Sequence, residues 1–159
     1  TLFPYTTLFR SIPNPHLKYF LLNSYNNYKT VDMNGYEITK FATSEVVKTI
    51  REYLDINNKT FDDYDALVLH QANLQIISAI GKRLNLDSRM LPTSLDEYAN
   101  TSGASPIVTI CHKYNRDKFI KPRDLNLIYS AFGIGLSWGV GDICINSDNI
   151  LPIYTCEDT

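Results

Sequence analysis

ALVLHQANLQIISAIGKRL, residues 66–84, has the pattern of a short buried strand followed directly by an amphipathic helix. Residues 66–69 are all apolar, which is typical of a parallel strand that is buried on both faces. His70 ends this strand, and Asn73 has a side chain suited to capping the helix that follows. One apolar helical face is predicted, made of Leu74, Ile77, Ile80, Gly81 and Leu84. A strand that leads straight into a helix is the building unit of an α/β fold.

Residues 34–146 are expected to form one α/β domain around this unit. Apolar residues recur at helical spacing over residues 38–54, which predicts a helix there. We expect a short strand over residues 90–94. Before the domain, residues 12–33 are rich in Pro, Asn and Tyr and are expected to be irregular, and so is the tail at residues 147–159.

The end of the predicted domain has one more helix and two strands. Asn100-Thr101-Ser102 suits the start of a helix, and apolar residues at helical spacing follow it. Two apolar strands are predicted at residues 125–132 and 136–145, joined by a Gly133-Ile134-Gly135 corner. We therefore expect the domain to close with a β-hairpin.

The composition is that of an ordinary globular protein of 159 residues, with 44% hydrophobic and 20% charged residues. A net charge of -2 gives no general reason to expect binding to nucleic acid. The longest apolar stretch, residues 131–145, contains Asp142 and is shorter than the roughly 20 residues of a membrane span. Cys111, Cys144 and Cys156 are widely spaced and suggest neither disulfides nor a metal site, so we expect reduced thiols in a cytoplasmic protein.

The first eleven residues, TLFPYTTLFRS, resemble the in-frame translation of a common sequencing-library adapter. Our hypothesis is that residues 1–11 are a non-native artefact and that the natural sequence preceding Ile12 is missing. The alternative is an irregular native extension. Sequencing the source locus across Ser11 distinguishes the two.

Polar or glycine-rich features stand at places where chemistry is common in α/β proteins. Ligands collect at the carboxyl ends of strands, where helix N-termini also point. His70, Asn100 and the glycine corner at 133–139 all fall at such places. Each also has a structural interpretation: a hydrogen-bonding histidine, a capping asparagine and glycines that serve a turn.

Three motifs that occur in this order favour the functional interpretation over the structural one. They are His70-Gln71-Ala72-Asn73, then Tyr98-Ala99-Asn100-Thr101-Ser102, then Phe132-Gly133-Ile134-Gly135-Leu136-Ser137-Trp138-Gly139. Together they resemble β-ketoacyl-acyl carrier protein synthase III over residues 34–145. The resemblance implies the C-terminal half of a thiolase-like fold, a mixed sheet flanked by helices, in a chain about twice as long that works as a homodimer.

The family's reaction is a decarboxylative condensation. A cysteine in the other half takes an acyl group from acyl-coenzyme A, malonyl-acyl carrier protein loses carbon dioxide, and the resulting carbanion attacks the acyl-enzyme. The resemblance thus implies acyl-coenzyme A and acyl carrier protein as partners, no metal or other cofactor, and a role in fatty-acid or related biosynthesis. Because the nucleophilic cysteine belongs to the other half, we expect the 159-residue chain itself to be inactive.

The resemblance also assigns site residues. His70 and Asn100 would be the catalytic pair, donating hydrogen bonds to the thioester oxygen as it becomes an enolate. An aspartate in place of Asn100 would repel that charge. The backbone N–H of Ile134, which stands where the family often has glycine, would contribute to an oxyanion hole. Gly35 and Asn73 match positions that line the pantetheine tunnel.

A basic patch is implied at the tunnel mouth, where an acidic carrier protein would dock on Lys40, Lys82 and Arg83. Lys82 and Arg83 are equally well explained as the solvated end of a helix. Gln75 replaces an arginine that is common in the family, so a different carrier or a non-carrier acceptor stays open. Two other functions stay open as well: another acyl transfer within the superfamily, and a non-catalytic subunit that binds acyl carriers or pairs with an active partner.

Overall fold

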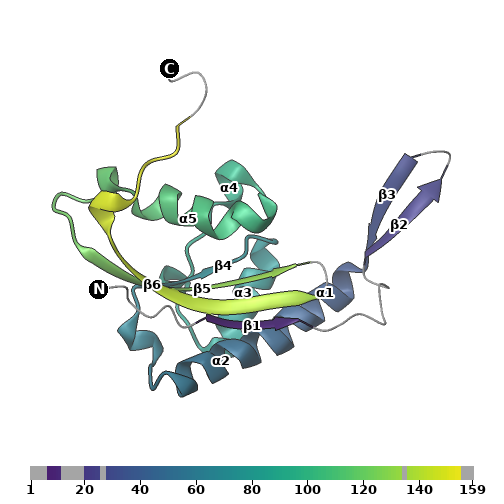
Figure 1. The fold of residues 1–159 in the computed structure, drawn as a ribbon, viewed down its shortest axis with the longest axis horizontal. Coiled ribbons are helices and arrows are strands. Elements are labelled where there is room, and N and C mark those ends of the chain that lie inside the picture. Colours follow the sequence, from purple (N-terminus) through teal and green to yellow (C-terminus); the bar gives the residue numbers. More distant parts are fainter. Residues whose placement is uncertain (1–6, 12–19, 26–27, 134–135, 155–159) are drawn as a thin grey trace.

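The core of the molecule is a mixed four-stranded sheet with helices on both faces (Figure 1). The computed structural model describes residues 7–11, 20–25, 28–133 and 136–154, with side chains described from residue 34 onward. The strand order is β1-β6-β5-β4. The strands are β1 (Thr7–Ser11), β4 (Ala66–Leu69), β5 (Asp124–Gly133) and β6 (Ser137–Asn146).

The pairing of the strands confirms the predicted α/β class and the closing hairpin. β4 runs parallel to β5, whereas β5 and β6 pair antiparallel from Asp124 opposite Asn146 to Gly133 opposite Ser137. All four residues of β4 are buried, as expected of a strand covered on both faces. The predicted mixed sheet is therefore present.

Two sets of helices cover the two faces of the sheet. On one face lie α1 (Gly35–Phe41), a π-helical segment η2 (Ala42–Val46), α2 (Val47–Ile56) and α3 (Leu74–Leu84). Their apolar residues share the larger core with Leu67 and Leu69, while α5 (Ser105–Tyr114) packs on the other face against Ala66 and Val68. Shorter helical turns are η3 (Phe61–Asp63), η4 (Ser88–Met90), α4 (Leu95–Tyr98), η5 (Ser102–Ala104), η6 (Arg116–Lys118) and η7 (Ser147–Asn149).

The helices confirm most of the sequence pattern and correct one detail. The helix predicted over residues 38–54 is present as α1, η2 and α2, which follow one another without a break. Asn73 caps α3, its Oδ1 accepting a hydrogen bond from the Ile76 backbone N–H at 2.8 Å. Leu74, expected on the buried face, is 59% exposed, and Ile76 takes its place in the core.

The strand predicted over residues 90–94 is wrong, because η4 and an irregular stretch occupy that region. Pro92 has no N–H to give to a sheet. The Ser94 N–H donates instead to the Gln71 side-chain oxygen at 3.0 Å, and the Ser94 hydroxyl pairs with that of Thr109 at 2.8 Å. Side chains therefore take up the polar groups that a strand would have paired.

Regular structure also occurs where an irregular chain was expected. β2 (Phe20–Tyr25) and β3 (Tyr28–Met33) pair antiparallel within the segment 12–33, and β1 pairs with the outer edge of β6. Aromatic and β-branched residues, which favour strands, are frequent in β2 and β3, and this was the signal to read there. The tail from residue 147 begins with the turn η7, after which Ile150 is buried beside α5.

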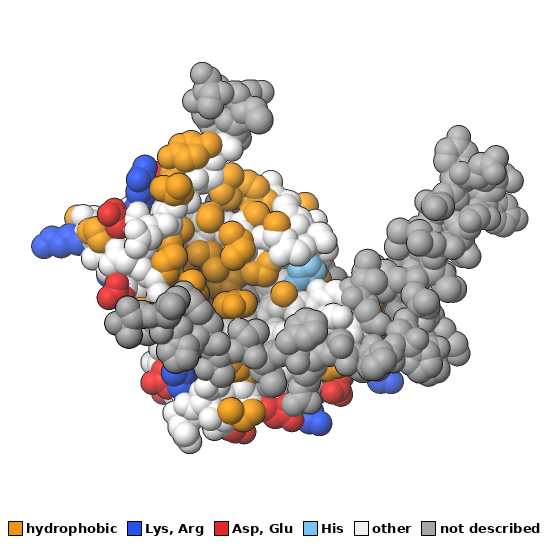
Figure 2. All heavy atoms as spheres, viewed as in Figure 1, with side chains coloured by type: hydrophobic (Ala, Val, Ile, Leu, Met, Phe, Trp, Pro, Cys, Tyr) orange, Lys and Arg blue, Asp and Glu red, His pale blue; other side chains and the backbone are white. Residues whose placement is uncertain are grey.

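Part of the sheet face beside α5 stays uncovered. Figure 2 shows hydrophobic side chains gathered between β6 and α5 on the face seen in Figure 1. Tyr129, Ile143 and Ile145 are only partly buried there, and on α5 itself Ile107 is 63% exposed. An apolar face of this kind is typical of a surface that contacts further protein.

Candidate functional site

A cavity of about 790 Å³ lies where the end of β4, the start of α1 and the β5–β6 hairpin meet. Its wall is largely apolar and includes Phe41, Phe132, Leu136 and Trp138. The predicted site residues Gly35, His70, Asn73 and Asn100 all line it, although 65 residues separate the first from the last. A mostly apolar cavity with a few polar groups is the usual form of a small-molecule site.

His70 is positioned by the strand that precedes it and by the aromatic wall. Its backbone N–H donates to the Ser130 carbonyl at 2.8 Å, which continues the β4–β5 pairing by one residue. The ring packs edge to face on Phe132, with centroids 5.1 Å apart. Burial lowers the pKa of His70, although a hydrogen bond with the backbone of Ser102 opposes this shift. The lowered pKa favours the neutral ring, which can donate a hydrogen bond without carrying charge.

The aromatic wall is itself anchored to the helix behind it. Phe41 packs edge to face on Trp138 with centroids 5.0 Å apart and on Phe132 at 6.2 Å. The Trp138 indole N–H donates to the Thr49 hydroxyl of α2 at 2.8 Å, so its polar atom has a partner in the core. This arrangement gives the cavity a rigid apolar side next to His70.

Asn100 lies in a tight loop between α4 and η5, and it is exposed at the cavity. Its Oδ1 accepts a hydrogen bond from the Ser102 backbone N–H at 2.9 Å, so the oxygen is engaged and the NH₂ is the group left for a ligand. Ala99 has φ 52° and ψ -154°, and Ser102 has φ 54°. Both are backbone conformations that residues other than glycine rarely adopt. Backbone strain of this kind is often found at functional sites.

Sequence reasoning missed a set of buried polar residues behind His70. The His70 Nδ1 lies 2.8 Å from the Ser105 Oγ, and that oxygen also accepts the Gln71 backbone N–H at 3.0 Å. Ser94, Thr109 and the Gln71 side chain continue the same network. The available signal was that Gln71 belongs to the motif that contains His70, and that Ser105 lies three residues after the motif that contains Asn100.

The structure describes two of the other predicted site residues, Gly35 and Asn73, but not Ile134. Asn73 is exposed at the cavity while its Oδ1 caps α3, and a Cβ at Gly35 would meet no atom within 4 Å, so the wall there is open. Ile134 lies outside the described residues. Its neighbours Gly133 and Leu136 both line the cavity. Their positions put the end of β5 and the residue before β6 at the edge of the site.

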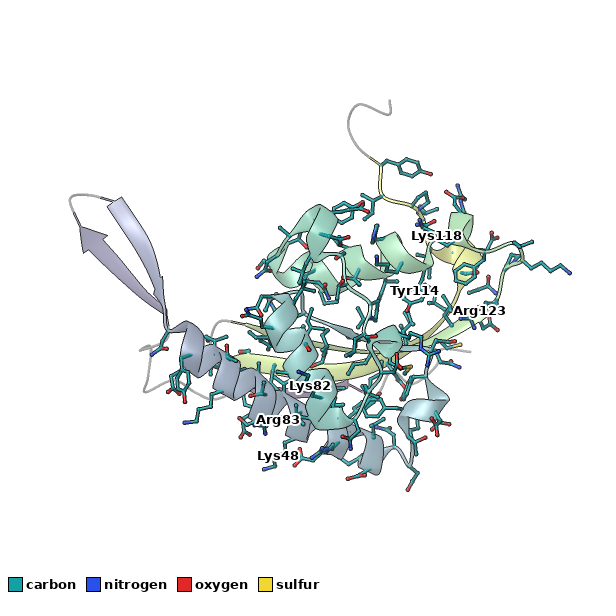
Figure 3. The ribbon with its side chains drawn as sticks, turned by 180° about the vertical axis from the view of Figure 1, so that it is seen from behind. Lys48, Lys82, Arg83, Tyr114, Lys118 and Arg123 are labelled. Carbon is teal, nitrogen blue, oxygen red and sulfur yellow. The ribbon has the colours of Figure 1, made fainter. Side chains whose placement is uncertain are left out.

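The predicted basic residues lie on the helices around the cavity rather than in its wall. Lys40 is in the last turn of α1, and Lys82 and Arg83 are exposed in the last turn of α3, where cations also complement the helix dipole. Figure 3 shows Lys82 and Arg83 on the same side of the molecule as Lys48 of α2. Arg51 of α2 donates to the Arg83 carbonyl, which ties the two helices together.

Three further observations concern the described residues. Cys111 and Cys144 are free thiols and neither lines it. In the part of the chain that the structure describes, no group of three or more His, Cys, Asp or Glu is arranged to hold a metal ion. Among those same residues, no helix combines the length and the apolar character needed to cross a membrane.

Comparison with known proteins agrees with the motifs and with the fold. Residues 54–143 match the family model described as 3-Oxoacyl-[acyl-carrier-protein (ACP)] synthase III C terminal. Beta-ketoacyl-[acyl-carrier-protein] synthase III of Clostridium perfringens is 43% identical over 109 residues, covering 69% of this chain and 33% of that protein. The synthase III of Blochmanniella pennsylvanica is 44% identical over 114 residues, covering 72% of this chain and 35% of that protein.

A solved structure gives the same result in three dimensions. The 3-oxoacyl-(acyl-carrier protein) synthase of Burkholderia xenovorans LB400 superposes with a TM-score of 0.79 at 25% identity, covering 92% of this chain and 45% of that one. The chain thus spans about a third of the length of the curated relatives it matches. The matched family model is that of the C-terminal part of the enzyme, and the chain belongs to the 3-oxoacyl-[acyl-carrier-protein] synthase III family.

Proposed function

We propose that this chain is the C-terminal part of an acyltransferase that condenses an acyl thioester with malonyl-acyl carrier protein, with loss of carbon dioxide, in fatty-acid or related biosynthesis. The observation that carries the proposal is that His70 and Asn100 line one cavity and are both held by the backbone of Ser102. Both side chains are neutral there and both have an N–H to donate.

The chemistry of decarboxylation explains why this pair is suitable. When the bond to the carboxylate breaks, its electron pair moves into the malonyl thioester and negative charge builds on the thioester oxygen. Donors that already point at that oxygen stabilise the charge without having to reorganise, and removing one such donor costs about 3 kcal/mol of transition-state stabilisation. The carbanion then attacks the acyl group on the cysteine of the other half, and the cysteine leaves as thiolate.

The rest of the proposed site follows from the cavity. Gly35 and Asn73, on the α1 and α3 sides of the wall, would contact the pantetheine arm. From the resemblance to the family, the Ile134 backbone N–H would complete the oxyanion hole. Acyl-coenzyme A and acyl carrier protein would be the partners, and the full-length protein would be a cytoplasmic homodimer. We infer no further cofactor and no role for nucleic acid.

The carrier protein would dock on the basic helix ends. Lys40, Lys82 and Arg83 were implied by the family, and the structure adds exposed Lys48 and Arg51 from α2 beside α3. We call these five residues the basic patch. An acidic carrier would be attracted to this patch by complementary charge.

Two departures from the family pattern support a second candidate, a relative that performs another acyl transfer or a non-catalytic subunit. Gln75 is exposed at the start of α3 in place of the usual arginine, and Ile134 replaces a glycine. The upstream coding sequence distinguishes these functions. A cysteine at a strand-to-helix turn in the other half supports an acyltransferase, and the lack of one favours the non-catalytic subunit.

The proposal is tested in the full-length protein that contains this chain. His70→Ala is expected to reduce malonyl decarboxylation by about a hundredfold or more, and to reduce acylation of the cysteine far less. His112→Ala is the matched control, because His112 pairs with Glu97 at 3.6 Å and does not line the cavity. An equal loss of both steps in His70→Ala would refute the assigned role.

A further inference from the structure

Ser105, the first residue of α5, is completely buried and lies against the side of His70 that faces the protein interior. Its Oγ is 2.8 Å from the His70 Nδ1 and 3.0 Å from the Gln71 backbone nitrogen. His70 and Gln71, the two residues that follow β4, therefore both contact one hydroxyl at the start of α5. This contact decides which nitrogen of His70 carries the proton.

The hydrogen-bond count at Ser105 favours one tautomer. The Gln71 backbone N–H can only donate, so it occupies a lone pair of the serine oxygen. Among the described residues, the one acceptor recorded for the hydroxyl proton is the His70 Nδ1. If Nδ1 carried a proton, both neighbours of the serine oxygen would be donors, and a fully buried hydroxyl proton would be left without a partner, which is costly.

The surrounding network prevents the hydroxyl from escaping this arrangement. The fully buried Gln71 side chain donates to the Leu69 carbonyl at 2.8 Å and accepts the Ser94 N–H at 3.0 Å, so Gln71 cannot turn its backbone N–H away. On the other side, the Thr109 hydroxyl donates to the Ser105 carbonyl at 2.8 Å and holds the start of α5. A buried network whose members are all paired is rigid.

We propose that Ser105 is a positioning residue that keeps His70 in the Nε2–H tautomer, with Nδ1 accepting from the serine hydroxyl and Nε2–H as the single donor of the ring. The use of that donor on a thioester oxygen rests on the proposed function. The tautomer does not, because Nδ1 is taken by the Ser105 hydroxyl, and the hydrogen bond between His70 and the Ser102 backbone then belongs to Nε2–H. Which ring nitrogen holds the proton is generally set by the bond that the other nitrogen makes.

The direct test is ¹⁵N NMR of the imidazole nitrogens in the full 159-residue chain at neutral pH. The expected result for the unaltered chain is His70 in the Nε2–H form. In Ser105→Ala the population of the Nδ1–H form should rise about fivefold, the factor set by one net hydrogen bond of ordinary strength. Ser94→Ala is the matched control, because it also removes a buried hydroxyl of the network but one that does not touch His70.

Two results would overturn the proposal. One is an Nδ1–H tautomer in the unaltered chain, a measurement that needs no variant to fold. The other is an unchanged tautomer ratio in Ser105→Ala, folded as judged by its amide spectrum. If Ser105→Ala does not fold, Ser105→Thr, which keeps the hydroxyl, should retain the Nε2–H form, and Ser105→Cys, a weaker donor, should shift toward Nδ1–H. The same ratio in both would count against the role.

An activity measurement in the full-length protein separates this inference from the proposed function. Ser105→Ala should lower kcat for malonyl decarboxylation about tenfold with little change in KM, and Ser94→Ala should not. If the tautomer shifts as expected but the unaltered protein does not decarboxylate malonyl-acyl carrier protein, the proposed function fails and the positioning role stands. If decarboxylation is normal and the tautomer ratio does not depend on Ser105, the positioning role fails and the proposed function stands.

Discussion

The Ser102 backbone N–H donates to the side-chain oxygen of Asn100 at 2.9 Å, so the orientation of the Asn100 amide is fixed by a residue two positions along the chain. The backbone of Ser102 also forms a hydrogen bond with His70. One residue thereby couples the two polar groups of the cavity. A substitution can therefore remove the N–H donor of one side chain while the hydrogen bonds that hold the loop are kept.

Asn100→Asp should preserve the loop and abolish the donor. One carboxylate oxygen can still accept the Ser102 N–H, whereas the other presents an acceptor and negative charge where the NH₂ stood. In the full-length protein we expect malonyl decarboxylation to fall by roughly a hundredfold to a thousandfold. Steady-state release of carbon dioxide measures this loss. Thermal unfolding of the same variant should stay close to that of the unaltered protein, and activity that survives would argue against a donor role for Asn100.

Ala99→Gly should stabilise the chain. The Ala99 backbone lies at φ 52° and ψ -154°, a region that costs a residue with a side chain about 1–3 kcal/mol. Glycine removes that strain but adds up to about 1 kcal/mol of unfolded-state entropy, so we expect a net gain of about 1 kcal/mol in the free energy of unfolding. Urea denaturation measures it. Ala104→Gly is the contrast: Ala104 has an ordinary helical φ of -78°, and we expect a loss of about 0.5–1 kcal/mol there.

Asp142 of β6 should make folding dependent on pH. Its carboxylate accepts hydrogen bonds from Lys59 at 2.8 Å and from the Tyr64 hydroxyl at 2.7 Å. Burial by itself raises the pKa of Asp142, but the hydrogen bonds from Lys59, Tyr64 and Tyr53 outweigh it and bring the pKa below its ordinary value. Burial, together with the bond to Asp142, raises the pKa of both tyrosines, which stay protonated.

The sign of the effect follows from that lowered pKa. A carboxylate with a depressed pKa in the folded state stabilises it above the ordinary aspartate pKa of about 4, and the contribution is lost as pH falls below that value toward the folded-state pKa. Asp142→Asn should cost about 1–2 kcal/mol at pH 7, since Lys59 is partly exposed and its charge is screened. The deficit should shrink below about pH 4. Urea denaturation at pH 7 and below about pH 4 measures the loss in the free energy of unfolding. Asp62→Asn, at an exposed position, is the control. A loss that is the same at both pH values would contradict the charge-based explanation.

Changes in the basic patch should weaken the binding of malonyl-acyl carrier protein and leave the binding of acyl-coenzyme A unchanged. Replacing both Lys82 and Arg83 with Glu reverses two exposed charges without touching the cavity wall. We expect the KM for malonyl-acyl carrier protein to rise about tenfold in the full-length protein, with KM for acyl-coenzyme A unchanged and with a weaker dependence on salt. Lys118→Glu, an exposed charge on η6 at a distance from these helix ends in Figure 3, is the control. Equal effects of both changes would identify Lys82 and Arg83 as ordinary surface residues.

The 159-residue chain should form no acyl-enzyme with acyl-coenzyme A. Cys144 is exposed on β6 and Cys111 is partly buried on α5, and neither lines the cavity that contains His70. Neighbouring His112 cannot serve Cys111 as base, because consecutive helix residues point in different directions. Intact-mass spectrometry after incubation tests this. Stoichiometric acylation at Cys111, Cys144 or Cys156 would place a nucleophile in this chain after all.

Sequence reasoning predicted the elements whose cause is local. Four consecutive apolar residues predicted β4, helical spacing predicted α2 and α3, and the glycine corner predicted the β5–β6 hairpin, because side-chain periodicity reflects the geometry of each element. The order of the three motifs also led to the family and to His70 and Asn100. The same reasoning failed for residues 90–94, because the polar groups of Ser94 pair with Gln71 and Thr109, which are far away in the sequence.

The amino-acid order alone was therefore enough for the class of fold and the family, and it led to the proposal that His70 and Asn100 are the two donors. Their environment depended on packing. His70 meets Ser105 across 35 residues because α5 packs on β4, and no periodicity records that contact. The strained backbone of Ala99 and the engaged oxygen of Asn100 likewise exist only once the loop between α4 and η5 has folded. Local patterns specify which element forms, whereas the proton position and the donor geometry come from atoms that only the folded chain brings together.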